Sequence, residues 1–533
     1  MNKLNLIYGV SLFGAIGMSC DEKPKLPKKP NIVLIVADDS GFSDLGCYGG
    51  EIRTPNLDAL ANNGLRFTQF YNTGRSWPTR SAMMTGYYPQ QTRSDPNRNQ
   101  FPEWTRCLPY WLKPAGYSCY HSGKWHVTGA GKVVADGGFD RSYLLLDYDR
   151  NFNPQKLLLD DKPLPPVEKG TDYYTTTAYT DYAIRFLKEH QTTRATQPFL
   201  LFLAYTVPHF PLQAPQEDID RCRERYKNGW EAVRAARYQR LKEMNLIHCG
   251  LAAVEEDVGP PYNNFATMMK TFPEMEVLFP LLWETLTPEQ QAFQIEKMAI
   301  HAAMVEVMDR EIGRVVAQLR EMGVLDNTLV MFLADNGASA ELMVRGDGQT
   351  EGAALGSADS YLCLGPGWSS VSNTPFRRHK TWVHEGGIST PFIVHWPAGI
   401  REKNGLRSDV SHLIDIVPTI LDVAGVTPVM PPGAPPFPGI SLTGSFAQNN
   451  AISHRELFFS HEGNKALRND QYKLVSAKRD GGDWELYDFT TDRCEQVNLA
   501  LQQPERVKIM SERWKALNDS FLKDAGEEVE KRQ

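Results

Sequence analysis

Short runs made almost wholly of apolar residues recur along the chain, and each is followed by polar residues. The three most regular runs are Asn31 to Ala37, Phe199 to Val207 and Thr328 to Ala334. Apolar runs of this length are typical of strands that are buried on both faces, as in a parallel sheet between helices. The pattern therefore predicts an α/β fold.

Amphipathic stretches lie between these runs, notably Asp218 to Met244 and Pro288 to Met322, where apolar residues recur at intervals of three and four. That spacing predicts helices with one apolar face, so we expect helices on both faces of the sheet. In such sheets the ligand site lies beyond the carboxyl ends of the strands. The polar residues that follow separate strands are thus expected to converge on one crevice.

The end of the chain has a different pattern. A proline-rich segment, Pro428 to Pro438, marks a boundary or a crossing between domains. Short alternating runs follow at residues 456–460, 472–476 and 484–487, and then an amphipathic stretch from Pro504 to about Ala525. We expect a large α/β domain over residues 31–440 and a small α+β domain over residues 441–533, with an antiparallel sheet and one packed helix.

The N-terminus has the pattern of an export signal. Lys3 precedes an apolar run from Leu4 to Met18 that is too short to span a bilayer, and Cys20 follows it. Residues 1–20 resemble a bacterial lipoprotein signal, although Gly17 stands where such signals usually carry a larger aliphatic residue, so ordinary cleavage is the alternative. Residues 21–30 are charged and rich in proline and are interpreted as a tether. The prediction is a lipid-anchored protein of the periplasm or cell surface of a Gram-negative bacterium.

Composition narrows the function classes. The chain has 533 residues, of which 41% are hydrophobic and 23% charged, so it can bury a large core and is not disordered as a whole. A net charge of -7 does not indicate the excess of positive charge that is typical of proteins that bind nucleic acid. We therefore expect a pocket for a small molecule, no nucleic-acid partner, and contact with a membrane only through the lipid anchor.

The eight cysteines fit no zinc pattern, because no two are spaced as in a C-x-x-C pair. Without Cys20 an odd number remains, so at least one thiol is unpaired in a monomer. A disulfide among the others is compatible with an oxidising compartment, but buried apolar thiols explain them equally well, and the pairing does not follow from the sequence.

Asp38 and Asp39 follow one predicted strand, and Asp335 and Asn336 follow another. These side chains offer only oxygen ligands, which hard divalent cations such as calcium prefer. One such pair alone is usually a turn or a helix cap. Two pairs at the ends of two buried strands favour a metal site.

Ser76 stands in the segment Gly74 to Gly86, where it could cap a helix whose first turn tolerates Pro78. A helix N-terminus presents free N–H groups and the positive end of the dipole, so an anionic ester would be well placed beside Ser76. Taken by itself, the segment is an ordinary capped helix.

These residues resemble the sulfatase family of the alkaline phosphatase superfamily. Ser76-Trp77-Pro78-Thr79-Arg80 is similar to that family's maturation motif, in which Cys or Ser followed by x-Pro-x-Arg is oxidised to formylglycine. The resemblance runs from about Pro30 to Asn498 and implies an alkaline-phosphatase-like large mixed sheet sandwiched by helices. Further similar blocks occur in the family order: Leu34 to Gly49, Gly123 to His126, Ala204 to Pro215, Asp326 to Gly337 and Asn373 to Pro397.

The resemblance also implies roles for the residues. Asp38, Asp39, Asp335 and Asn336, together with modified Ser76, would hold one calcium ion. The physical case for formylglycine is that a plain serine would leave a stable sulfate ester on the enzyme, whereas an aldehyde hydrate has a second hydroxyl that can expel sulfate.

Five basic residues would complete the site. By the same resemblance, Arg80 and Lys124 would fix the formylglycine and His126 would contact its hydroxyls, while His209 and Lys380 would grip the sulfate and help to protonate the leaving alcohol. A basic residue of this kind, taken alone, is more often structural or at the surface. These five are assigned to one site only because their motifs occur in the same order as in the family.

Serine at position 76 departs from the cysteine of many family members. In the family the serine form is matured by a radical enzyme, which is therefore an expected partner. The predicted substrate is a sulfate ester, and the predicted location favours a sulfated glycan. The alternatives are a phosphoester or phosphonate hydrolase of the same superfamily, and a non-catalytic lipoprotein that binds sulfated glycans.

Overall fold

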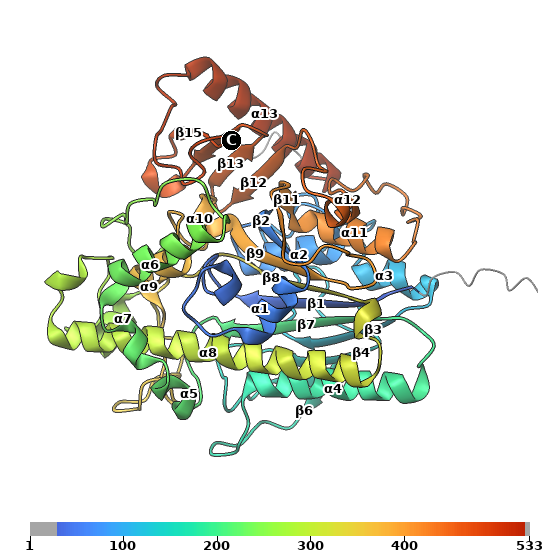
Figure 1. The fold of residues 1–533 in the computed structure, drawn as a ribbon, viewed down its shortest axis with the longest axis horizontal. Helices are drawn as coiled ribbons and strands as arrows, with labels where there is room; N and C mark the ends of the chain where they lie inside the picture. The colour runs from blue at the N-terminus through green and yellow to red at the C-terminus, as the bar shows by residue number, and fades with distance from the viewer. Residues whose placement is uncertain (1–28, 528–533) are drawn as a thin grey trace, which may run out of the picture.

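The computed structural model describes residues 29–527, and the expected signal with Cys20 and nearly all of the tether lie outside them. A large mixed sheet of eleven strands runs through the molecule (Figure 1), in the order β10-β2-β9-β8-β1-β7-β3-β4-β5-β6 with β11 paired to β2. Its strands are β1 (Asn31–Asp38), β2 (Leu65–Tyr71), β3 (Ser118–Gly123), β4 (Arg141–Leu145), β5 (Leu157–Leu159), β6 (Lys162–Leu164), β7 (Phe199–Pro208), β8 (Thr328–Ala334), β9 (Ser389–His395), β10 (Gly405–Arg407) and β11 (Ser411–His412).

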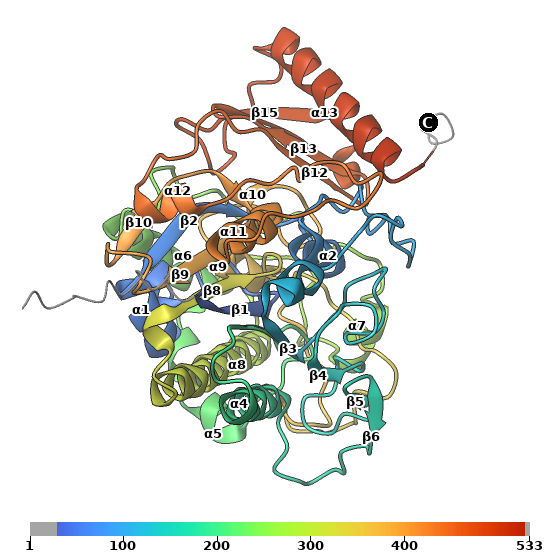
Figure 2. The same ribbon diagram turned by 90° about the vertical axis from the view of Figure 1, so that its right-hand side faces the viewer.

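Helices cover both faces of this sheet, as Figures 1 and 2 show. The helices are α1 (Pro55–Asn62), α2 (Ser76–Thr85), α3 (Leu108–Leu112), α4 (Thr175–Thr193), α5 (Gln216–Asp220), α6 (Gly229–Glu243), α7 (Ala266–Thr271), α8 (Pro288–Glu321), α9 (Gly365–Ser372), α10 (Glu385–Ile388), α11 (Ile416–Val423), α12 (Thr443–Ala447) and α13 (Pro504–Asp524). Within the described part of the chain, none of them is long and apolar enough to cross a membrane.

The central strand β1 contributes to two apolar clusters, one on each face of the large sheet. Its side chains alternate between the faces, so Val33 and Ile35 pack toward the α4 and α8 side while Leu34 and Val36 pack toward the α2 and α11 side. Every residue of β1 is buried, which is why the run carries no polar alternation. The predicted α/β fold with helices on both faces is confirmed.

The predicted helix from Asp218 to Met244 is wrong as one element. The structure divides it into α5, a short 3-10 turn and α6, which begins at Gly229. Gly229 has a φ of 80°, outside the helical region, and a Cβ there would lie 2.2 Å from the ring of Trp283. The positive φ of Gly229 therefore interrupts the helical backbone, and the ring of Trp283 leaves no room for a side chain at this position. The second predicted helix is present as α8.

The small C-terminal sheet is antiparallel, with the order β12-β13-β14-β15, and α13 packs on one of its faces (Figure 2). Its strands are β12 (Leu457–His461), β13 (Asn464–Arg468), β14 (Tyr472–Ser476) and β15 (Trp484–Asp488). The sheet and its helix agree with the prediction. β13 was not predicted, because its Asn, Lys and Arg residues hide the apolar pattern.

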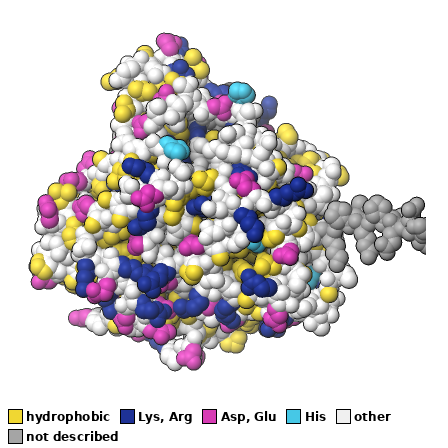
Figure 3. Space-filling view, in the orientation of Figure 1, with side chains coloured by type: hydrophobic (Ala, Val, Ile, Leu, Met, Phe, Trp, Pro, Cys, Tyr) yellow, Lys and Arg dark blue, Asp and Glu magenta, His cyan; other side chains and the backbone are white. Residues whose placement is uncertain are grey.

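Basic side chains gather over the α5 and α8 region in Figure 3, with acidic side chains beside them. They are ion-paired: Arg223 contacts Glu296, Arg225 contacts Glu306, and Arg310 Nη1 lies 3.0 Å from Asp218 Oδ1. Because these arginines already have acidic partners, this cluster does not form an uncompensated positive surface.

A buried ion network joins the two sheets. Glu385 of α10 accepts from Lys473 of β14 at 3.0 Å and from Arg493 at 2.9 Å, and Tyr71 of β2 donates to it at 3.0 Å. Burial raises the pKa of Glu385, but Lys473 and Arg493 more than offset it and lower the pKa from 4.5 to about 2.

This network predicts acid sensitivity. Because the folded-state pKa of Glu385 is lowered, its stabilisation is present above pH 4.5 and is lost as the pH falls toward about 2. We expect Glu385→Gln to reduce the free energy of unfolding at pH 7 and to flatten its slope over this window, measured by urea denaturation at a series of pH values. Asp519→Asn, in the exposed pair with Lys515, is the control. An unchanged slope in Glu385→Gln would contradict the prediction.

Candidate active site

Two pairs of polar residues follow neighbouring strands of the large sheet. Asp38 ends β1 and Asp39 follows it, while Asp335 and Asn336 come directly after β8. The two strands run parallel and in register up to their ends, so both pairs emerge at the same edge. The structure thus brings together the side chains that the sequence pattern places at strand ends.

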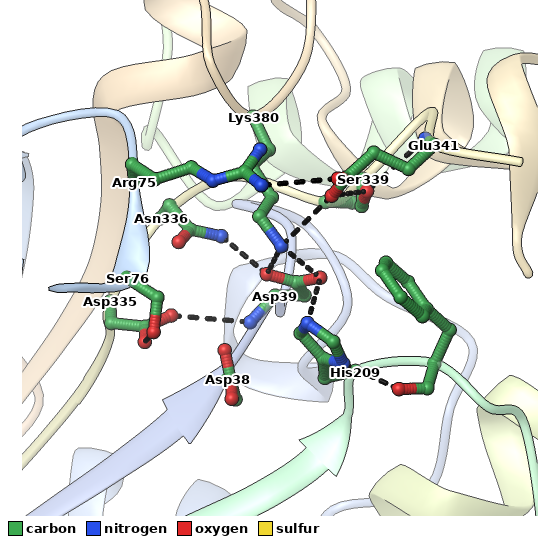
Figure 4. A network of polar contacts seen from close by, with 12 residues as sticks. Asp38, Asp39, Arg75, Ser76, His209, Asp335, Asn336, Ser339, Glu341 and Lys380 are labelled. Atoms are coloured by element: carbon green, nitrogen blue, oxygen red, sulfur yellow. Dashed lines mark hydrogen bonds and ion pairs between the residues drawn. The ribbon is translucent and has the colours of Figure 1, made fainter. Parts of the chain in front are cut away.

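Ser76 lies against these acids (Figure 4). Its hydroxyl donates to Asp335 Oδ2 at 2.9 Å, and Nε of Arg80, one turn further along α2, donates to the same hydroxyl at 3.2 Å. His126 Nδ1 lies 3.4 Å from it. Since Ser76 is the first residue of α2, it also stands where unpaired N–H groups and the helix dipole favour an anion.

Asp335 is the carboxylate that joins Ser76 to the rest of the site. Arg80 Nε donates to its Oδ2 at 2.8 Å, and the backbone N–H of Asp39 donates to its Oδ1 at 3.2 Å. Burial raises the pKa of Asp335, but the positive charges of Arg80 and Lys124 outweigh burial and the net pKa is lowered. The group beside the Ser76 hydroxyl is therefore an ionised acceptor.

Asp38 lies deeper, between two cations. Lys124 Nζ contacts its Oδ2, and Arg80 Nη2 lies 3.7 Å from the same oxygen. Burial and the charge of Asp335 nevertheless raise the pKa of Asp38 to about 7. Ionising both Asp38 and Asp335 costs electrostatic free energy, because the two carboxyl groups are close together. The positive charge of the neighbouring side chains does not fully offset this cost.

Asp39 is the second focus of charge. Lys380 Nζ lies 2.8 Å from each of its carboxylate oxygens, and Asn336 Nδ2 donates to Oδ1 at 2.7 Å. His209 Nε2 is 3.8 Å from Oδ2 (Figure 4). The five predicted basic residues are thus all at the cluster: Arg80, Lys124, His126, His209 and Lys380.

The two histidines are neutral in this environment. Burial, with Lys380 and Lys124 beside it, holds the pKa of His209 well below its usual value. The pKa of His126 is lowered in the same way, by burial and then by Lys124. Lys380 remains charged, because Asp39 and Glu341 raise its pKa more than burial lowers it.

Glu341 belongs to the site but was not singled out from the sequence. Its Oε2 lies 3.1 Å from Lys380 Nζ and accepts from Ser339 Oγ at 2.9 Å, while its Oε1 lies 3.1 Å from Arg75 Nη2. Burial raises the pKa of Glu341, but Lys380 and Arg75 bring it down to about 2. The only signal in the sequence was a lone acid six residues beyond Asp335.

The donor set fits a hard divalent cation. Among the described residues, Asp38 Oδ1 and Asn336 Oδ1 are buried oxygens without a hydrogen-bond partner. Ligand atoms of Asp38, Asp39 and His209 lie within 4.8 Å of one another. His209 adds a nitrogen that the predicted all-oxygen set did not contain. Oxygen-rich surroundings with an excess of buried carboxylate suit calcium or magnesium.

A pocket of about 610 Å³ lies beside this cluster. Its walls come from the segment after α6, at residues 262–267, and from the segment after β8, at residues 341–345. A further contribution comes from Glu462, in the turn between β12 and β13 of the small sheet. The lining residues are Arg75, Tyr262, Asn264, Ala266, Thr267, Glu341, Met343, Val344, Arg345 and Glu462.

Comparison with known proteins identifies the class. The sulfatase family matches residues 30–426, and a family described as N-sulphoglucosamine sulphohydrolase, C-terminal, matches residues 377–522. An uncharacterized sulfatase of Schizosaccharomyces pombe is 30% identical over 91% of this chain and 93% of its own length. An arylsulfatase of Klebsiella aerogenes is 31% identical over 80% of this chain and 93% of its own.

A solved structure of a protein in complex with its substrate D-glucosamine-2-N,6-O-disulfate has a TM-score of 0.63 and 20% identity, and covers 95% of this chain and 100% of that one. The fold and the matches define an enzyme of the alkaline-phosphatase-like class. Within that class the chain belongs to the sulfatase family and is a sulfuric ester hydrolase. The predicted resemblance is confirmed.

Proposed function

We propose that this sulfatase releases sulfate from a sulfated glycan, using a formylglycine made from Ser76 and one bound calcium ion. The observation that carries the proposal is the placement of the Ser76 hydroxyl. It lies 2.9 Å from the ionised Asp335 and within reach of Arg80, at the start of a helix and beside an oxygen-rich cluster. A structural serine would not need these partners.

Oxidation of Ser76 to formylglycine explains how the residue at position 76 could attack sulfur and still be regenerated. A formylglycine hydrate supplies two hydroxyl groups on one carbon, one to attack sulfur and one whose deprotonation lets sulfate leave. Asp335 is placed to accept a proton from the side chain at position 76. Arg80 fixes both groups at once, because its Nε contacts the Ser76 oxygen and Asp335 Oδ2.

The remaining cations compensate the charge of the transferred group. Lys124 and Lys380 are buried beside Asp38 and Asp39, where low dielectric strengthens their attraction for a sulfuryl oxygen. Lys380 is charged and can donate a proton to the leaving alcohol, while neutral His209 can offer an N–H hydrogen bond.

Calcium would be held by oxygen atoms of Asp38, Asp39, Asp335, Asn336 and the residue at position 76, with His209 near the same position. Bound there, the ion would supply positive charge that stabilises the three buried acids and polarises the substrate. The unpartnered oxygens Asp38 Oδ1 and Asn336 Oδ1 support this assignment.

The glycan assignment is supported by the relatives and by the expected location. One structural neighbour has a disulfated glucosamine as its substrate. Export with an anchor at Cys20 would place the enzyme at the cell envelope, and the disulfide Cys249–Cys494 is in keeping with an oxidising compartment. A radical-type maturing enzyme is the proposed partner for Ser76.

The test combines mass spectrometry with an assay. Protein co-expressed with a serine-type maturing enzyme is digested, and the peptide containing Ser76 is expected to lack two hydrogens. The same protein should release sulfate from 4-nitrophenyl sulfate and lose this activity in a chelator, with recovery on addition of calcium. Complete conversion of Ser76 without sulfate release from aryl or sugar sulfates would reject the proposal.

A further inference from the structure

Arg345 is an exposed guanidinium group beside the active site with no ion pair or hydrogen bond to any residue in the range 29–527. Its Cζ lies 5.1 Å from the ring centroid of Phe210, in cation–π contact. The same ring lies 5.5 Å from Lys380 Nζ and stands next to His209, with ring centroids 4.1 Å apart. One aromatic side chain therefore separates Arg345 from Lys380 and His209.

The neighbouring cations have partners, which sets Arg345 apart from them. Arg75, which lines the same pocket, is bound to Glu341 at 3.1 Å and donates to Thr381 Oγ1 at 2.8 Å. Arg150, across from Arg345, pairs with Asp347 at 2.5 Å. The guanidinium of Arg345 thus keeps all its donors available for a ligand.

Arg345 also stands between two pockets. It lines the pocket of about 610 Å³ beside Arg75 and Glu341, and a second pocket of about 280 Å³ formed by residues 147–156 and 345–348. Glu341 touches Lys380, and Arg75 immediately precedes Ser76. If the sulfate group of a bound molecule lies at Ser76, the rest of that molecule would therefore extend through the larger pocket toward Arg345.

We propose that Arg345 is a specificity-determining residue that binds a second anionic group of the substrate, a sulfate or a carboxylate on the same or the adjoining sugar. This inference rests on the proposed glycan sulfatase function. A guanidinium group matches such anions because its planar donors can bind two oxygens at once, and the cation–π contact with Phe210 restrains the position of the group. The preferred substrate is thus a polyanionic saccharide with at least two negative groups.

The test measures binding separately from turnover. In the Ser76→Ala background, calorimetry would compare glucosamine 6-sulfate, glucosamine 2-N,6-O-disulfate and a monosulfated disaccharide that carries a uronic carboxylate. We expect the better of the two dianionic sugars to bind about 10- to 100-fold more tightly than the monosulfate. Adding Arg345→Gln should abolish that preference, and Arg345→Lys should restore only part of it. The dianionic sugar that binds more tightly shows whether the second anionic group is a sulfate or a carboxylate.

Arg506→Gln is the matched control, because Arg506 is also a surface arginine over an aromatic ring, that of Tyr472, but belongs to α13. It should keep the preference. The proposal is overturned if the Ser76→Ala protein binds none of the sugars, if it shows no preference, or if Arg345→Gln keeps the preference. Turnover of 4-nitrophenyl sulfate by matured enzyme is measured in parallel, so that a failed sulfatase mechanism is distinguished from a failed role for Arg345.

Discussion

Ser76→Ala is expected to lower kcat/KM for 4-nitrophenyl sulfate by about 10⁴-fold or more. The substitution removes the atom that Asp335 and Arg80 both contact, so the carboxylate and the cations remain in place without a nucleophile between them. Sulfate should still bind, because Lys124 and Lys380 are unchanged. The measurement is initial rates of the wild type and the variant, both co-expressed with the maturing enzyme, with binding of substrate followed separately.

The fold should survive this change. Asp335 keeps Arg80 and the backbone N–H of Asp39 as partners, so the free energy of unfolding should move by less than about 1 kcal/mol. Ser76→Cys is the informative companion variant. With a cysteine-type, oxygen-using maturing enzyme it should regain activity, and without any maturing enzyme it should not. Substantial activity of Ser76→Ala would show that another residue attacks sulfur.

Replacing both cysteines of the Cys249–Cys494 disulfide with serine should lower the free energy of unfolding by about 3–5 kcal/mol. The bond joins positions that are 245 residues apart, so it restricts the unfolded chain strongly. It also ties the start of the loop that carries Tyr262 to the segment after the small sheet. The shift is measured as the urea midpoint, with and without a reducing agent.

Cys222→Ser is the matched control, because Cys222 is equally buried but forms no disulfide. It removes a thiol without opening a cross-link and should cost less than the double variant. Reduction should bring the wild-type protein to the stability of the double variant and leave that variant unchanged. Equal midpoints for oxidised and reduced wild type would contradict the prediction.

Much of the site could be predicted because its main parts depend on local pattern. Residues 31–37 and 328–334 are buried on both faces, so their boundaries appear directly as the change from apolar to polar residues. Parallel order then forces Asp38 and Asp335 to the same edge of the sheet. The serine motif at the start of α2 adds a position where a helix end favours an anion.

The parts that could not be predicted depend on tertiary contacts between irregular segments. Glu341 and Arg75 form an ion pair only because the segment after β8 folds over α2. Cys249 and Cys494 meet across the whole fold, and seven candidate thiols gave no basis for choosing them. The space for a side chain at Gly229 is occupied by Trp283, a residue more than fifty positions away.

The turn between β12 and β13 reaches the pocket from a different part of the chain than the catalytic residues. Tyr262 donates to Glu462 at 2.8 Å, and Asn464 Nδ2 donates to the backbone oxygen of Thr381, next to Lys380, at 3.0 Å. Under the proposed glycan sulfatase function, part of the surface facing the sugar would therefore come from a different segment of the chain than the residues that break the sulfur–oxygen bond. Grafting this hairpin tip from one relative into another offers a route to redirect sugar preference while the sulfuryl chemistry stays intact.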